Sequence, residues 1–296
     1  MASWGGVAGK RTVITGATNG IGLAAAIELA RRGADLTLVA RSQARAAAAV
    51  RQIETVSKAG AGVDVMLAEL ASQSSVRQLA AELLARYATT QVLINNAGAI
   101  YATRQMTDDG VERTWAVNHL APFLLTTLLL DRLKASAPAR IVTTSSDAHQ
   151  GAVIPFDDLD AARSWGGAGF TRYGQTKLAN ILFTAELARR LEGTGVTANC
   201  FHPGFVRTGF NRNNGVLMRL GMAISGPFAR SPQKGAQTLI WLVDSEEAGA
   251  FNGGYFADLH QLAPSGAAQQ AETAQRLWRV SEQQTGASSA RASPGP

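Results

Sequence analysis

Short apolar runs alternate along the chain with longer runs of helical spacing. The apolar runs 35–40 (DLTLVA) and 91–95 (QVLIN) have the length and the Val, Ile and Leu content of strands buried on both faces. The run 21–32 that precedes the first of them repeats its apolar residues every three or four positions, as one buried helix face requires. This alternation predicts a parallel sheet covered by helices.

The same two patterns predict the remaining elements. The expected strands are 11–15, 35–40, 63–68, 91–95, 140–144, 196–201 and 254–256. The expected helices are 21–32, 42–58 with a Ser42 cap, 72–87, 112–135, 173–191, 232–244 and a last one around Trp278. No repeat or second compositional regime interrupts the series. We therefore expect an α/β fold with a single-domain, Rossmann-type doubly wound parallel sheet and helices on both faces, over residues 1–284, followed by a disordered tail, 285–296.

Composition and charge exclude several classes of protein. With 46% hydrophobic and 17% charged residues among 296, the chain is not a disordered protein. The net charge of +6 comes from scattered, mostly single arginines without interleaved aromatics, so we expect no nucleic-acid partner. No apolar stretch approaches the roughly 20 residues of a membrane helix, and no signal peptide is visible. These features predict a cytoplasmic protein without a membrane span.

Cysteine and histidine usage argues against a metal site. The single cysteine, Cys200, excludes an internal disulfide and a CxxC zinc motif. The four histidines are scattered without HxxxH spacing, so we expect no metal. Cys200 lies in an apolar run and is expected to be a buried small side chain.

A glycine-rich turn joins the first predicted strand to the first predicted helix. It reads TGATNGIG over residues 15–22, with the spacing Gly-x3-Gly-x-Gly. Glycines let the backbone approach a pyrophosphate, and the helix N-terminus offers unpaired N–H groups and a positive dipole end. Any tight turn can use glycine. The position of this turn, between the first strand and the first helix, strengthens its interpretation as a dinucleotide-binding turn. The residues of this turn that are candidates for binding a dinucleotide are Gly16, Thr18, Asn19, Gly20, Ile21 and Gly22.

Further motifs follow later strands in a fixed order. They are Asn95-Asn96-Ala97-Gly98, Ser145-Ser146, Tyr173-x3-Lys177 and His202-Pro203-Gly204. With the glycine turn, they make the chain similar to the short-chain dehydrogenase/reductase family over about residues 9–260. The phrases VNHLAPF, HPGFVRT and SPQKGAQT resemble its retinol-dehydrogenase-like and carbonyl-reductase branch most.

Tyr173 and Lys177 are the candidate proton-transfer pair. Four residues apart on a helix, they share one face. A phenol ordinarily has a pKa near 10, and a neighbouring ammonium should lower that pKa and let Tyr173 exchange a proton with a carbonyl oxygen. The resemblance implies that Ser146 binds the substrate oxygen, that Lys177 also holds the nicotinamide ribose, and that Asn118 anchors a water. Ser145 is the alternative serine, but the family's residue is usually the second of such a pair.

The end of the second predicted strand bears on the choice of coenzyme. NAD enzymes generally carry an acid there, whereas an arginine accommodates the 2′-phosphate of NADP. The chain has Arg41-Ser42 and no acid at positions 39–42, so we expect NADP(H), although Arg41 is one arginine among many. Where the family usually has an adenine-contacting Asp, this chain has Glu69-Leu70, and the longer Glu need not reach the ring. The resemblance adds Asn96, Ala97, Gly98, Pro203, Gly204, Val206 and Thr208 to the coenzyme site.

The expected function is an NADPH-dependent reductase of ketones or aldehydes, a secondary-alcohol dehydrogenase in reverse, for a lipophilic small molecule. Residues 204–231 are apolar enough to form a substrate lid, but packing of the same residues on the sheet explains them equally well. The long segment between Ser146 and Tyr173 matches the retinol-dehydrogenase-like branch and is expected to form a pocket wall.

Two other functions compete with this one. Relatives that modify nucleotide sugars use the same Tyr and Lys, but with another glycine turn and a larger C-terminal domain. A non-catalytic NADP-binding regulatory protein of the same fold would typically have lost the Tyr or the Lys. The oligomeric state stays open, because the long helices 112–135 and 173–191 form homodimer and homotetramer interfaces in many relatives while other relatives are monomers.

Overall fold

The computed structural model describes residues 4–58, 60–206 and 229–287, and the expected alternation of strands and helices is confirmed there. The strands are β1 (Arg11–Thr15), β2 (Asp35–Ala40), β3 (Val63–Leu67), β4 (Val92–Asn95), β5 (Ala139–Thr144), β6 (Val196–Phe201), β7 (Tyr255–Ala257) and β8 (His260–Leu262). The helices are α1 (Gly20–Arg31), α2 (Gln43–Glu54), α3 (Gln73–Arg86), α4 (Arg113–Trp115), α5 (Ala121–Ala135), α6 (Phe170–Arg190), α8 (Pro232–Asp244) and α9 (Ala271–Thr285).

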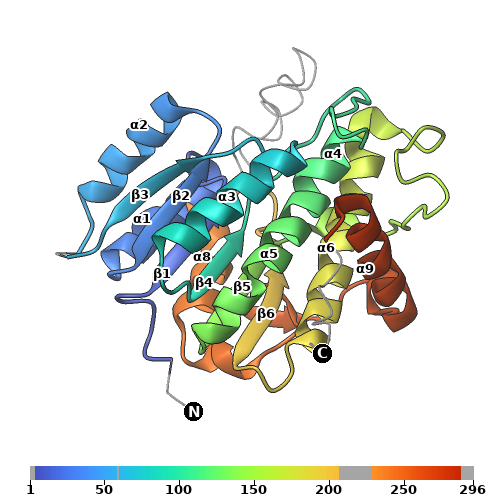
Figure 1. Cartoon of the computed structure of the whole chain (residues 1–296). Helices are drawn as coiled ribbons and strands as arrows, with labels where there is room; N and C mark the ends of the chain where they lie inside the picture. The colour runs from blue at the N-terminus through green and yellow to red at the C-terminus, as the bar shows by residue number, and fades with distance from the viewer. Residues whose placement is uncertain (1–3, 59, 207–228, 288–296) are drawn as a thin grey trace, which may run out of the picture.

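The described strands form one sheet in the order β3-β2-β1-β4-β5-β6-β7-β8 (Figure 1). Neighbours from β3 to β7 run parallel, and β8 adds an antiparallel edge. The chain order reverses where β1 lies beside β4, and open α/β sheets bind ligands outside the carboxyl ends of the strands at such a point. The predicted doubly wound, Rossmann-type fold is confirmed.

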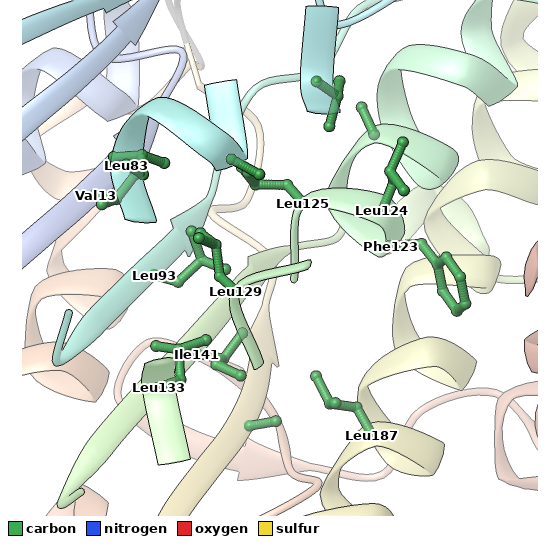
Figure 2. Close-up of a cluster of buried hydrophobic side chains, with 14 of the residues drawn as sticks. Val13, Leu83, Leu93, Phe123, Leu124, Leu125, Leu129, Leu133, Ile141 and Leu187 are labelled. Atoms are coloured by element: carbon green, nitrogen blue, oxygen red, sulfur yellow. The ribbon is translucent and has the colours of Figure 1, made fainter. Parts of the chain in front are cut away.

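Two apolar layers hold helices to the two faces of this sheet. On one face, α1, α2 and α8 bury Ala and Leu side chains, and their small residues let α1 and α8 lie close together. On the other face, α3, α5 and α6 cover the sheet, with α9 packed outside α6. Figure 2 shows Leu93 and Ile141 of the strands beside Leu129 of α5, and Val13 of β1 beside Leu83 of α3. No helix in the described ranges is long and apolar enough to cross a membrane.

The structure differs from the sequence-based expectations at a few boundaries. The expected helix 112–135 is interrupted by a π-helical turn, Ala116–Leu120, between α4 and α5. Strand β8 was not expected. Helix α2 ends at Glu54 rather than at 58, although Ser42 caps it as expected, accepting from Arg45 N. Helix α9 reaches Thr285, the first residue of the expected tail; residues 288–296 lie outside the described residues, and the domain limits stay a prediction.

His119 fixes the C-terminal helix to the π turn. Its Nε2 lies 2.8 Å from Ser281 Oγ of α9, and Trp115 Nε1 donates to Gln284 Oε1 at 2.9 Å. The His119 side chain is fully buried, and this burial lowers its pKa from 6.5 to about 3. His119 is therefore neutral in the folded protein at any pH near neutrality.

This burial makes folding stability depend on pH. The pKa of His119 is lower in the folded than in the unfolded chain, so its contribution is present above about pH 6.5 and is lost as pH falls toward 3. Between pH 7 and 5 the wild type should lose about 2 kcal/mol of unfolding free energy through this one group. Urea unfolding of His119→Gln should show a correspondingly smaller loss. His260→Gln, a change at an exposed histidine, should keep the wild-type loss, and an equal loss in all three proteins would contradict the assignment.

Candidate active site

The glycine turn after β1 is held tightly against the end of β4. Gly16 and Gly20 have positive φ values of 71° and 55°, which side-chain-bearing residues rarely adopt. Asn96 Nδ2 donates to the carbonyls of Thr15 and Gly16, at 3.0 and 3.3 Å. Thr15 Oγ1 accepts from the backbone N–H groups of Asn96 and Ala97, each at 3.0 Å. Two of the sequence motifs therefore form one rigid unit at the switch point.

The start of α1 has the properties of a site for a phosphate group. Asn19 is its N-cap residue but makes no side-chain capping hydrogen bond, and the first turn carries no acidic residue. Among the described residues, no acidic side chain therefore caps this helix start, and its first N–H groups and positive dipole end can bind an anion. Thr18 lies in the same turn, Gly20 and Ile21 begin the helix, and Gly22 packs tightly against Gly16 and Asn96. These residues fit a dinucleotide pyrophosphate.

Lys177 is buried where α6 crosses the end of β5. Its Nζ donates to Thr144 O at 3.1 Å, and Gly98 lies beside it, close enough that a Cβ there would be 3.5 Å from Nζ. Burial lowers the pKa of Lys177 to about 8. The ammonium of Lys177 is thus held in a fixed position and loses its proton more readily than a solvated lysine does.

The two adjacent serines have different contacts. Ser145 is buried, and its Oγ donates to the Lys177 carbonyl at 2.8 Å, which fastens α6 to the end of β5. Ser146 Oγ accepts from Ala148 N at 3.2 Å, and the Ser146 side chain interacts with the Tyr173 phenol and lowers its pKa. Of the pair, Ser146 is the one that meets the tyrosine.

The pKa of Tyr173 moves in the opposite direction from the one expected. Burial raises it to about 12, while the hydrogen bond with Ser146 lowers it by less. The Lys177 ammonium lies 5.3 Å from the centre of the tyrosine ring. Desolvation of the phenolate is the largest effect on this pKa, and the lowering expected from Lys177 is not among its causes. Tyr173 keeps its proton at neutral pH.

Asn118 lies in the π turn and clamps one backbone unit. Its Oδ1 accepts from Ala99 N at 2.7 Å, and its Nδ2 donates to Ala99 O at 2.8 Å and to Thr176 Oγ1 at 3.1 Å. The clamp joins the segment after β4 to α6, one residue before Lys177. Short π segments inside helices are frequent at functional sites.

The residues after β2 and β3 meet at the surface. Arg41 Nη1 lies 3.8 Å from Glu69 Oε2, with both side chains about half exposed. Glu69 Oε1 also accepts from Ala71 N at 3.0 Å, while Leu70 packs against the core. The arginine expected to bind a 2′-phosphate and the acid in the family's adenine position are thus neighbours.

The segment after β6 is described up to Val206. Gly204 has a φ of 73° and lies against the Arg230 guanidinium, and Val206 bridges to Arg230. Pro203 is partly buried beside them. Thr208 and most of the expected lid, 207–228, lie outside the described residues.

The structure adds a buried ion pair that the motifs did not reveal. Arg172 Nε donates to Glu112 Oε2 at 2.8 Å, and neither side chain is exposed. Glu112 also caps α4, and Arg172 donates to the Leu159 carbonyl. The sequence signal was faint: charged residues at the starts of two apolar helices, one of them beside Tyr173.

His149 is the second such addition. Its ring is fully buried between the backbone of Ser146 and that of Ser265, and the Tyr255 ring packs on it at 5.1 Å. Its position three residues after Ser146 was visible in the sequence, but its distant partners were not.

The fold and this cluster together define a Rossmann-type protein built to bind a dinucleotide beside a Ser, Tyr and Lys. The chain belongs to the short chain dehydrogenase family, whose model matches residues 10–216. It is accordingly an oxidoreductase of the kind that uses a nicotinamide cofactor.

Similar proteins and structures agree with this membership. Human retinol dehydrogenase 13 is 41% identical over 98% of this chain and 89% of its own length, and mouse retinol dehydrogenase 12 is 43% identical over 93% and 86%. A solved protein of Mycobacterium paratuberculosis has a TM-score of 0.76 and 33% identity, covering 96% of this chain and 98% of its own. A short chain dehydrogenase from Burkholderia cenocepacia in complex with NADP has a TM-score of 0.67 and 28% identity, over 89% and 99%. The retinol-dehydrogenase-like resemblance is confirmed.

The closeness of α1 to the turn can be tested by adding one methyl group. A Cβ on Gly22 would lie 2.5 Å from Asn96 Nδ2 and nearer still to the Gly16 carbonyl. Gly22→Ala should therefore destabilise the fold by about 1–3 kcal/mol and weaken coenzyme binding. Thermal unfolding and a coenzyme-binding titration measure both effects. Gly266→Ala, where a Cβ meets nothing within 4 Å, should change neither, and a wild-type-like Gly22→Ala would refute the close approach.

Proposed function

We propose that the chain is an NADPH-dependent carbonyl reductase, acting in reverse as a secondary-alcohol dehydrogenase, with a lipophilic small molecule as substrate. The observation that carries this proposal is the interaction of the Tyr173 phenol with the Ser146 side chain beside the buried Lys177. A bound nicotinamide would supply or accept the hydride. The residues of the chain supply the proton and the binding of the carbonyl oxygen.

Tyr173 is the proposed proton donor. Its raised pKa keeps the phenol protonated at neutral pH, which is the form that a carbonyl reduction requires. Ser146 gives the same oxygen a second hydrogen bond and positions it. Lys177, with a pKa of about 8, is mostly protonated at neutral pH and stabilises the phenolate that remains after proton transfer. It would also hold the nicotinamide ribose.

Asn118 is proposed to act through its main chain. Both polar groups of its side chain already have protein partners, Ala99 and Thr176. A water that carries protons between Lys177 and solvent would therefore be anchored by the backbone of the π turn. The side chain keeps that turn in place.

Two features support a lipophilic substrate. Phe170, Phe205 and Val153 are about half or more exposed, on segments next to Tyr173, Gly204 and Ser146. Large exposed apolar side chains beside a polar site favour an apolar ligand. The similar proteins are named retinol dehydrogenases, and retinol is a lipophilic alcohol. A panel of ketones and aldehydes with NADPH, followed at the nicotinamide absorbance band, tests the reaction.

The preference for NADPH rests on Arg41, with Ser42 beside it at the start of α2. A guanidinium can bind a 2′-phosphate through two parallel charge-assisted hydrogen bonds. Glu69 is close enough to compete with that phosphate for Arg41, which moderates the preference. Two similar solved proteins are described with bound NADP. The cytoplasmic location stays a prediction that cell fractionation can test.

Replacing the phenol of Tyr173 tests the proton donor. Tyr173→Phe keeps the ring and removes the hydroxyl, so carbonyl reduction should slow by at least ~100-fold while NADPH still binds. Steady-state turnover and a coenzyme titration measure the two effects. Tyr87→Phe removes a hydroxyl bonded to Asp64 instead and should stay within a few-fold of wild type. Turnover of Tyr173→Phe near the wild-type rate would exclude Tyr173 as the donor. A wild type that binds NADPH but reduces no carbonyl would favour the regulatory alternative.

Replacing Arg41 tests the coenzyme preference. The wild type should prefer NADPH over NADH by at least ~10-fold in kcat/KM, about 1.4 kcal/mol, because the site is half exposed. Arg41→Ala should remove most of this preference by weakening NADPH alone, and added salt should reduce it in the wild type. Arg51→Ala, at an exposed position near the other end of α2, is the control. A wild-type preference for NADH would overturn this assignment.

A further inference from the structure

The turn that carries Ser146 is fixed by a histidine that the mechanism above does not use. Ser146 is the N-cap of a short 3-10 turn, Asp147–His149. The Ser146 carbonyl oxygen makes two contacts with His149, one with its backbone N at 3.2 Å and one with its ring Nδ1 at 2.9 Å. The other ring nitrogen, Nε2, lies 3.1 Å from the backbone N of Ser265. Both ring nitrogens are thus engaged by backbone.

These partners allow only one form of the ring. A carbonyl oxygen can only accept, so Nδ1 must carry a proton and donate it to Ser146. A backbone N–H can only donate, so Nε2 must be unprotonated and accept from Ser265. The Tyr255 hydroxyl lies 3.5 Å from Nδ1, too far to compete with the shorter bond to Ser146. The contacts therefore assign the donor role to Nδ1 and the acceptor role to Nε2 of His149.

The surroundings hold this ring rigidly. His149 is fully buried, and the Tyr255 ring of β7 packs edge-on against it, with the His202 ring stacked on Tyr255 in turn. The turn itself presses on α6, since a Cβ on Gly174 would lie 2.6 Å from the Ala148 carbonyl. Gly174 directly follows Tyr173. The serine turn is thus set against the tyrosine helix on one side and against the C-terminal part of the chain on the other.

We propose that His149 is a positioning residue for Ser146: by donating from Nδ1 to the Ser146 carbonyl and accepting at Nε2 from Ser265, it sets the serine hydroxyl at the distance from Tyr173 that the reaction needs. This inference rests on the proposed carbonyl reduction. His149 touches no reacting atom. Its effect on rate passes through the backbone of Ser146, where a displacement of about 1 Å can cost up to ~100-fold.

Two substitutions separate the two ring nitrogens. In His149→Asn, the amide nitrogen occupies the position of Nδ1, so the bond to Ser146 can persist while the acceptor for Ser265 is lost. In His149→Gln, the longer side chain puts an oxygen near the position of Nε2, so Ser265 can keep its acceptor while Ser146 loses its donor. Each variant is the control for the other.

The two variants should affect kcat and the hydrogen exchange of the Ser265 amide in opposite ways. His149→Gln should lower kcat about tenfold or more with little change in coenzyme affinity, and its Ser265 amide should exchange hydrogen as slowly as in the wild type. His149→Asn should keep kcat within about threefold, while the Ser265 amide exchanges faster. A purely structural role would lower the melting temperature, kcat and exchange protection together in both variants. That joint loss, or a wild-type kcat in His149→Gln, would overturn the proposal.

Nitrogen NMR of the histidine rings provides a readout that does not depend on activity. The His149 signals should show a protonated Nδ1 and an unprotonated Nε2, and the opposite tautomer would refute the bridge. If the wild type reduced no carbonyl, the proposed reaction would be refuted, and so would the proposed effect of His149 on its rate. In that case the NMR and exchange results would still decide whether His149 joins Ser146 to Ser265.

Discussion

The site depends on how helix α6 is fastened to the carboxyl end of β5. Thr144, the last residue of that strand, accepts from Lys177 Nζ at 3.1 Å and from Asn180 Nδ2 at 3.2 Å, while Ser145 donates to the Lys177 backbone at 2.8 Å. These bonds fix both the height and the rotation of α6 above the strand. Ser146, the next residue, is thereby brought to Tyr173. The same burial that allows this packing lowers the pKa of Lys177 and raises that of Tyr173, so the anchoring also sets the proton chemistry.

The Arg172–Glu112 pair anchors the other side of α6. A fully buried ion pair gives up much of its Coulomb gain to desolvation, so its presence is weak evidence for stability. Its geometry is more informative. Glu112 begins the α4, π-turn and α5 series that carries Asn118, and Arg172 directly precedes Tyr173. Separating the two side chains would leave an unpaired buried charge, at a cost of about 3–5 kcal/mol of folding free energy. The pair therefore resists any movement of the two helices relative to one another.

Periodicity was sufficient to predict the fold, and motif spacing supplied most of the candidate site residues. Strands buried on both faces are continuous apolar runs, so their limits were predictable to within a residue or so. The π turn was not, because its residues read as ordinary helix and only the clamp of Asn118 on Ala99 reveals its purpose. Strand β8 was missed because its three residues are exposed and have no apolar pattern. The pKa of Tyr173 was predicted in the wrong direction, because spacing gives the distance to Lys177 but not the depth of burial.

The motif residues carry the chemistry, whereas residues remote from them in sequence determine their placement. Asn118 and His119 are neighbours in the π turn, yet one binds the segment after β4 and the other binds Ser281 of α9. His149 likewise joins Ser146 to Ser265, and Tyr255 packs on its ring. The C-terminal part of the chain is therefore a second support for the site, built from side chains that no local motif identifies. Because each of these hydrogen bonds has a modest net strength, their number and direction matter more than the strength of any one of them. The placement of the reacting groups therefore depends on hydrogen bonds from side chains remote in sequence and not on the motifs alone.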